Sequence, residues 1–102
     1  MRKDQFIEIT EWQKKTFSKS TSLSKISHLK QELEELISDL KDRSENRSLE
    51  FADCFLLLFG AAAADGMSYE DICDCIDEKM KINYQRNWGK PDSDGVVNHL
   101  KQ

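Results

Sequence analysis

Residues that interrupt helices are scarce in this sequence of 102 residues. It contains one proline, Pro91, and four glycines, Gly60, Gly66, Gly89 and Gly95. Runs of β-branched residues, which favour strands, are absent. Because proline and glycine are the residues that most disfavour a helix interior, the sequence predicts an all-α protein made of long helices.

Apolar residues recur at helical spacing in the first half of the chain. Residues 4–19 are predicted to form a helix that ends in the serine- and threonine-rich stretch of residues 18–24, which favours a loop. Residues 24–43 form the second predicted helix, because their apolar residues follow one stripe. The first row consists of Phe6, Ile9, Gln13 and Phe17, and the second stripe of Ile26, Leu29, Leu33, Leu36, Ile37 and Leu40.

Two further helices complete a predicted four-helix bundle. Residues 48–65 are apolar almost all the way round, which predicts a buried central helix ending where Gly66 adopts a left-handed cap. Ser68 is a suitable residue to cap the fourth helix. The stripe of that helix consists of Tyr69, Ile72, Cys73, Ile76, Met80 and Asn83.

The chain has the length of one ordinary domain, so residues 1–102 are expected to form a single domain. Residues 4–90 are its predicted compact part, and residues 91–102 read as a turn-rich tail. Only 38% of the residues are hydrophobic and 33% are charged, so the core is small. We therefore expect oligomerisation, as a homodimer or homotetramer, to complete the bundle.

The charge balance limits the possible partners. A formal net charge of -4 and a pI near 5.1 argue against binding a nucleic-acid polymer, which requires a basic surface. A small phosphorylated ligand remains possible if a metal ion supplies positive charge. The longest apolar run, residues 54–64, is too short for a membrane span, and the three cysteines form no CxxC pair. These features predict a cytoplasmic protein with reduced thiols and no membrane contact.

Two pairs of carboxylates are the strongest functional signal. Glu32 and Glu35 lie on the second predicted helix, and Glu50 and Asp53 lie on the third. Residues three apart project from the same side of a helix, so two antiparallel helices would bring four carboxylates together. Oxygen ligands of this kind suit Mg²⁺ or Mn²⁺.

The alternative is that these acids belong to an ordinary solvated helix face. We accept this interpretation for Glu34, but Glu50 and Asp53 interrupt an apolar helix, where an unpaired charge is costly to bury. Metal ligation is the better reading of that pair. His28 and Asp39 project from the same side as Glu32; for His28 support of the ligands and solvation are equally plausible, and for Asp39 solvation is favoured.

A row of polar residues on the fourth helix suits phosphate oxygens. Lys79, Asn83 and Arg86 are spaced by four and three residues, and Asn83 stands where the apolar stripe predicts another apolar residue. The alternative for the two cations is an ordinary exposed position. Trp12 and Trp88 are expected to pack in the core or at an oligomer contact, and stacking on a nucleotide base is their functional alternative.

These residues resemble the MazG-like all-α nucleotide pyrophosphohydrolases, and among them the dATP/dGTP diphosphohydrolase branch. The family's ExxE and ExxD pairs read here as Glu32–Glu35 and Glu50–Asp53. The closer likeness to that branch lies in residues 28–29, 50–53, 64–66 and 78–88, and the similarity extends over about residues 12–99. Gln31 departs from the pattern, since many relatives carry an acid directly before the first ligand.

The resemblance implies hydrolysis of dGTP or dATP to the monophosphate and pyrophosphate, by attack of a metal-activated water on the α-phosphorus. It implies two or more Mg²⁺ ions, or Mn²⁺, held by the four acids. Glu35 is our choice for the group that positions or deprotonates the water. Lys79, Asn83 and Arg86 are assigned to the phosphates or sugar, and Trp12, Phe17 or Trp88 to the base pocket. Similar proteins come from bacteriophages, which would place this one in the host cytoplasm.

Two other functions are compatible with the same residues. The metal site contacts only phosphates, so a pyrimidine or another nucleotide could be the substrate. A non-enzymatic helical interaction module, whose acids only solubilise the bundle, is the second alternative.

Overall fold

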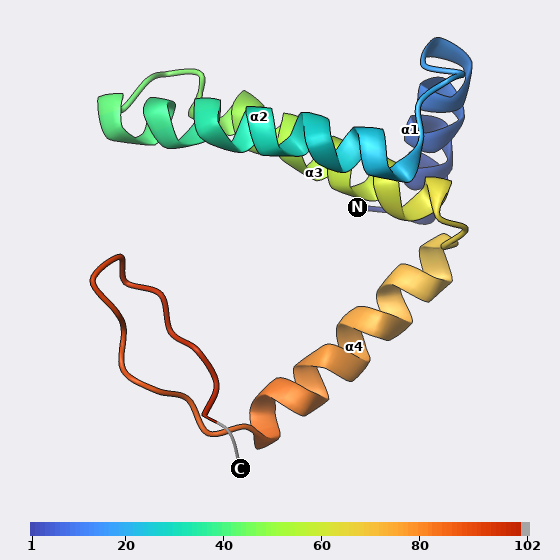
Figure 1. Ribbon diagram of the computed structural model, residues 1–102. Coiled ribbons are helices and arrows are strands. Elements are labelled where there is room, and N and C mark those ends of the chain that lie inside the picture. Colours follow the sequence, from blue (N-terminus) through green and yellow to red (C-terminus); the bar gives the residue numbers. More distant parts are fainter. Residues whose placement is uncertain (101–102) are drawn as a thin grey trace. The chain divides into compact units, whose positions relative to one another are not determined.

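The computed structural model describes residues 1–100, and within them the chain forms four helices. They are α1 (Lys3–Thr16), α2 (Ser22–Asp42), α3 (Arg47–Ala64) and α4 (Tyr69–Gln85) (Figure 1). Over these 100 residues the only β-type pairing is an isolated bridge between Trp88 and His99. The all-α prediction is confirmed. The chain divides into two compact units, Met1–Glu70 and Asp71–Gln102.

The start of α2 shows how the serine- and threonine-rich stretch is used. Thr21 Oγ1 accepts a hydrogen bond from Ser24 N at 3.1 Å, and Ser24 Oγ accepts one from Thr21 N at 2.8 Å. This capping box satisfies two backbone donors at once. The helix therefore begins at Ser22, two residues before the predicted start, and part of the predicted loop is helical.

α2 and α3 form an antiparallel pair that is the main interface of the first unit (Figure 1). A short turn joins them, in which Arg43 adopts a left-handed conformation with φ 53° and Ser44 N donates to Asp39 O at 2.9 Å. At the far end of the pair, Ser22 Oγ donates to Ala61 O at 2.9 Å. The pairing is therefore fastened at both ends.

Only part of each apolar stripe is covered within one chain. Leu36, Cys54 and Ala61 are buried between the two helices. Phe55 remains 57% exposed and Leu58 52% exposed, so α3 is not enclosed as its composition predicted. Most of the exposed apolar residues of the pair lie on one side, and Leu23 and Leu49 lie elsewhere. Those on the shared side are Ile26, Leu33, Ile37 and Leu40 on α2 and Phe51, Phe55 and Leu58 on α3.

Helical spacing separates the exposed apolar residues from the acids. On α3, Phe51, Phe55 and Leu58 follow one row, about 100° round the helix from Glu50. On α2 the apolar row and the row of Glu32 and Glu35 lie on opposite edges of the face that meets α3. The α2/α3 pair thus has one apolar side and one acidic side.

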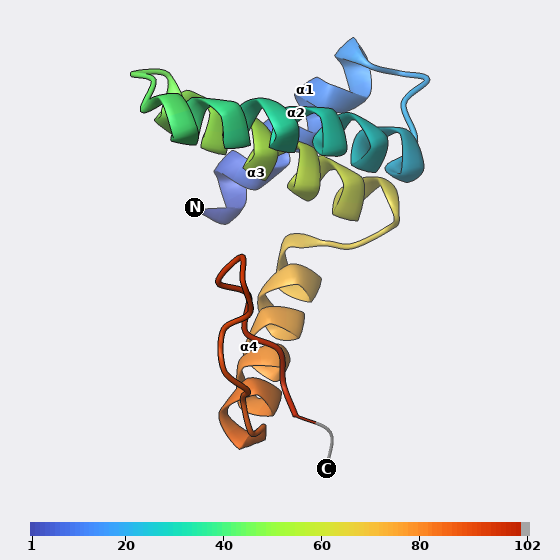
Figure 2. The same ribbon diagram turned by 60° about the vertical axis from the view of Figure 1, so that its left-hand side comes forward.

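α1 packs across α3 in the first unit (Figure 2). Phe6 is only 4% exposed and its ring lies edge-on to Phe59, with centroids 6.2 Å apart. Gln13 is also buried, and its Nε2 donates to Leu56 O at 3.0 Å. A Cβ at Gly60 would overlap Gln13 Oε1 and lie 2.9 Å from Gln13 Cδ, so glycine makes room for this amide.

The second unit contains most of α4 and the segment that follows it. Gly89 N donates to Asn98 O at 2.8 Å and Asp92 N to Val96 O at 2.9 Å, so residues 87–100 fold back on themselves. Gly95 has φ +81°, and Asp92 Oδ1 accepts hydrogen bonds from the backbone of residues 94 and 96. The predicted turns are confirmed, and the described part of the tail forms a closed loop.

No single helix among residues 1–100 is long and apolar enough to cross a membrane. α3 and α4 reach the length and apolar composition of a membrane span only when they are taken together, across the break between them.

The contact between Gly60 and Gln13 gives the first testable prediction. Gly60→Ala should lower the melting temperature, because the new methyl group displaces a buried amide that is hydrogen-bonded to Leu56. In a Gln13→Ala background the same change should raise the melting temperature, because alanine is favoured over glycine in a helix by about 1 kcal/mol. Thermal unfolding of the four proteins measures this reversal, and an equal effect in both backgrounds would contradict the contact.

Candidate metal centre

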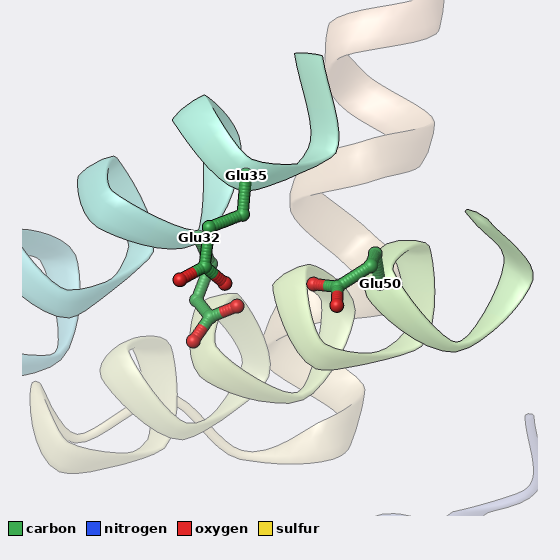
Figure 3. Close-up of side chains that lie close together, drawn as sticks. All are labelled: Glu32, Glu35 and Glu50. Carbon is green, nitrogen blue, oxygen red and sulfur yellow. The ribbon is translucent and has the colours of Figure 1, made fainter. Parts of the chain in front are cut away.

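Three carboxylates from two helices converge on the acidic side of the α2/α3 pair. Glu32 and Glu35 project from α2 and Glu50 from α3 (Figure 3). One oxygen of each lies within 4.8 Å of the others. This spacing matches a set of ligands around one or more small divalent cations.

The positions of the three residues follow from the local sequence. Glu32 and Glu35 are one turn apart on α2, and Glu50 lies in the first turn of α3, where the helix dipole favours a negative charge. The short turn between the helices brings these two segments side by side. Three of the four carboxylates predicted from sequence therefore meet, and Asp53 is not among them.

The cluster holds more negative charge than its surroundings neutralise. Burial is the main cause that raises the pKa of Glu50, followed by the charges of Asp39, Glu32, Glu35 and Asp53. Glu50 Oε2 is shielded from solvent and has no hydrogen-bond partner within residues 1–100. An unpaired buried oxygen beside other carboxylates is what a cation would relieve, so these residues fit a divalent metal.

The pKa of Glu35 is also raised, but its main cause differs from that for Glu50. Hydrogen bonding to Glu32 raises the pKa of Glu35 most, and the charge of Glu32 adds to the increase. Burial and the charge of Asp39 contribute further, whereas His28 lowers the pKa. Glu35 is itself exposed, so water can reach its carboxylate.

His28 and Asp39 are the two residues that the sequence placed on the same side of α2 as Glu32. His28 Nε2 lies 3.2 Å from Glu32 Oε1, so the histidine contacts a predicted ligand, although its own side chain is 58% exposed. Asp39 is half-buried and its charge raises the pKa of both Glu35 and Glu50. The assignment of Asp39 to a solvated role stays a prediction.

Asp53 lies one turn after Glu50, but it is exposed and is not among the three carboxylates that converge. Its charge nevertheless raises the pKa of Glu50. Its predicted role as a ligand stays a prediction.

Two of the predicted phosphate-binding residues, Lys79 and Asn83, lie on α4 in the second unit. Arg86 was predicted on the same helix, but α4 ends at Gln85 and Arg86 directly follows it. Asn83 and Arg86 are half-buried, and Lys79 is exposed. Trp88 Nε1 donates to Asn83 O at 3.1 Å, and its ring lies edge-on to His99 at 6.1 Å. This indole therefore helps to end α4. The roles of these four residues toward a nucleotide remain predictions.

A pocket of about 320 Å³ lies in the first unit, where α1 meets the start of α2 and the end of α3. Phe17 forms part of its wall, as predicted for a base pocket, and Trp12 packs edge-on against Phe17 at 5.6 Å. Trp12 itself is 57% exposed and does not line the pocket.

Sequence reasoning missed three residues of this pocket: Gln13, Lys25 and Gly60. Gln13 interrupts the apolar row of α1, and Lys25 lies seven residues before Glu32 on the same face of α2. For Gln13, a polar residue in an otherwise apolar row is the signal that could have found it; the sequence carries no comparable signal for Lys25.

Comparison with known proteins agrees with the site. Residues 4–102 match the family model of the dATP/dGTP pyrophosphohydrolases. The chain belongs to this family. Among solved structures it is similar to a MazG-like pyrophosphohydrolase of cyanophage S-2L, which was determined with dGDP and three catalytic Mn²⁺ ions per active site. The sequences are 26% identical over 96% of this chain and 95% of that one, with a TM-score of 0.79.

A search of curated proteins gave no match. Membership of the dATP/dGTP pyrophosphohydrolase family confirms the resemblance seen in the sequence, and the structural likeness confirms the MazG-like fold. The protein is thus a nucleotide pyrophosphohydrolase with a divalent-metal site, and the non-enzymatic interaction module is set aside.

The shifted pKa of Glu50 gives the second prediction. Because folding raises the pKa of Glu50, ionising this carboxyl costs more free energy in the folded state than in the unfolded state. This cost lowers the stability of the protein increasingly as the pH rises above the ordinary pKa of 4.5, and it is absent below that pH. In the metal-free protein, Glu50→Gln should therefore raise the melting temperature at neutral pH, and the gain should vanish in acid. Thermal unfolding in the presence of chelator, from acid to neutral pH, measures the difference in melting temperature between Glu50→Gln and the wild-type protein.

Glu34→Gln is the matched control, because Glu34 is exposed and lies outside the cluster. A gain from Glu50→Gln that does not change with pH would contradict the electrostatic explanation.

Proposed function

We propose that this protein hydrolyses a purine deoxynucleoside triphosphate, dGTP or dATP, to the monophosphate and pyrophosphate. The observation that carries the proposal is the convergence of Glu32, Glu35 and Glu50 within 4.8 Å on one open side of the helix pair. The dGDP bound to the cyanophage neighbour supports a purine nucleotide as the substrate.

Glu32, Glu35, Glu50 and Asp53 would hold two or more divalent cations, Mg²⁺ or Mn²⁺. Such ions supply positive charge to the phosphate oxygens and increase the acidity of water. The proposed ligands differ in the contacts that their oxygens already make. His28 holds Glu32 by its contact at 3.2 Å, whereas the unpartnered Oε2 of Glu50 is available to a ligand. The neighbour's three Mn²⁺ ions support a site for several metals.

Glu35 is the proposed group that positions the attacking water and accepts its proton. It is the exposed member of the three converging carboxylates, so water can reach it, and a general base must lie within hydrogen-bond reach of the proton that it accepts. The bond that breaks joins the α-phosphorus to the oxygen that bridges it to the β-phosphorus. Pyrophosphate leaves on the side opposite the attacking water.

The remaining substrate contacts are assigned by residue chemistry. Arg86 and Lys79 would neutralise the charge on the phosphate oxygens, and Asn83 would orient the phosphates or the sugar. Trp12 and Trp88 are the proposed aromatic contacts of the base. Trp12 adjoins the 320 Å³ pocket through Phe17, which supports its assignment.

The third prediction concerns activity. The protein with Mg²⁺ or Mn²⁺ should release pyrophosphate and monophosphate from dGTP or dATP, and chelator should abolish the release. Glu35→Gln should lower kcat by about a hundredfold or more, as removal of a general base does, and Glu34→Gln should not. Separation of the products from all four deoxynucleoside triphosphates tests this. A preference for dCTP or dTTP would contradict the purine assignment, and release of orthophosphate would contradict cleavage at the α-phosphorus.

We further propose that the active form is a homodimer or homotetramer. The apolar side of the α2/α3 pair exposes Phe51, Phe55 and Leu58 together with four aliphatic residues of α2. A patch of this kind is unusual on a soluble monomer and is typical of an interface between subunits. Because it lies opposite the acidic side, a second copy can cover it without closing the metal site.

The fourth prediction tests this interface. Phe55→Glu places a charge in the centre of the patch and should convert the oligomer to monomer, measured by light scattering during size exclusion. Leu49→Glu is the control, because Leu49 is also exposed on α3 but lies on another face. A wild-type protein that elutes as a monomer, or an oligomer that Phe55→Glu leaves intact, would contradict the proposal.

A further inference from the structure

The pocket between α1, α2 and α3 contains a buried cation, Lys25, that forms no ion pair within residues 1–100; Glu11 also lines the pocket but lies beyond salt-bridge distance. Lys25 is only 8% exposed, and within residues 1–100 no carboxylate lies within salt-bridge distance of its Nζ. Its one recorded partner is the ring of Phe17, 5.6 Å from Nζ to the centroid. A cation–π contact stabilises an ammonium but leaves its hydrogen-bond donors available.

A second buried polar side chain, Gln13, also lines the pocket. Gln13 is 6% exposed, and its Nε2 is held by Leu56 O while its Oε1 has no partner among the described residues. Gln13 and Gly60 both line the pocket, but this oxygen is shielded from solvent where Gln13 packs against Gly60. A buried polar atom without a partner is costly.

The pocket lies within reach of the metal centre along α2. Lys25 and Glu32 are seven residues apart, which places them on the same face of the helix about 10 Å from each other. A nucleotide whose phosphates lie at the carboxylate cluster can span this distance with its sugar and base. The volume of about 320 Å³ and the wall of Phe17, Ala63 and Ala64 suit a flat aromatic group.

We infer that this pocket binds the base of the substrate and selects guanine over adenine through Lys25. An ammonium donates to the O6 and N7 acceptors of guanine, whereas adenine presents an amino group in place of O6. Gln13, which also lines the pocket, would form part of the wall beside the base. The inference rests on the proposed function, and it names the residue that sets the preference between the two purines.

The fifth prediction tests the pocket without turnover. In the presence of chelator, isotope-labelled protein is titrated with dGMP and with dAMP and followed by NMR. We expect dGMP to bind about tenfold more tightly, as one charge-assisted hydrogen bond would give, and to shift the Gly60 amide and the Gln13 side-chain amide. Lys25→Met, which keeps the apolar stem, should abolish this preference.

Two further variants complete the design. Lys25→Arg keeps the charge and should retain the preference for dGMP, whereas Lys15→Met removes an exposed lysine of α1 outside the pocket and should change nothing. In the activity assay, Lys25→Met should lower the ratio of kcat/KM for dGTP to that for dATP by the same factor. A preference for dGMP that survives in Lys25→Met, or shifts confined to residues outside the pocket, would overturn the inference.

The outcome is separable from that of the proposed function. Pyrophosphate release from purine triphosphates with an unchanged purine preference in Lys25→Met would leave the proposed function intact and remove the role of Lys25. Absence of pyrophosphate release would instead contradict the proposed function, whatever the monophosphates bind.

Discussion

Repulsion among carboxylates at the α2/α3 interface is the constraint on which the rest of the structure depends. Glu32, Glu35 and Glu50 are held within 4.8 Å of one another, and Asp39 and Asp53 add to the negative potential. Folding therefore brings together groups that would separate in water. The capping box at Thr21, the bond from Ser22 to Ala61 and the buried contacts of Leu36, Cys54 and Ala61 hold the two helices in this arrangement. Repulsion within the cluster lowers the stability of the metal-free protein, and a metal ion that neutralises the carboxylates would recover this free energy on binding.

The two sides of the helix pair have different tasks. The acidic side carries the exposed carboxylate of Glu35 beside the half-buried Glu32 and Glu50, and in the proposed function these oxygens bind cations that in turn contact the phosphates. The opposite side exposes Phe51, Phe55 and Leu58, which one chain leaves uncovered. A small protein with a modest core can gain stability by covering such a side with a second copy, and the site stays accessible because the two sides do not overlap.

α1 adds selectivity to this scaffold. It crosses α3 at Gly60, where the missing side chain admits the buried amide of Gln13, and it supplies one wall of the pocket that contains Lys25. Metal ligands recognise phosphates, which all nucleotides share. Discrimination between bases requires hydrogen-bonding groups at the other end of the ligand, and Lys25 is the donor that we propose for this role.

The sequence by itself determined the class of fold, the four helices to within a few residues and the two pairs of acids, because helical spacing and the scarcity of proline and glycine are local properties. It did not determine the start of α2, where Thr21 and Ser24 cap each other, or that Asp53 lies outside the group of carboxylates that converge. Nor did it find the pocket of Gln13, Lys25 and Gly60. These features depend on which faces of separate helices meet, and only the tertiary structure decides that, because a side chain's partners across an interface are set by the packing of whole helices.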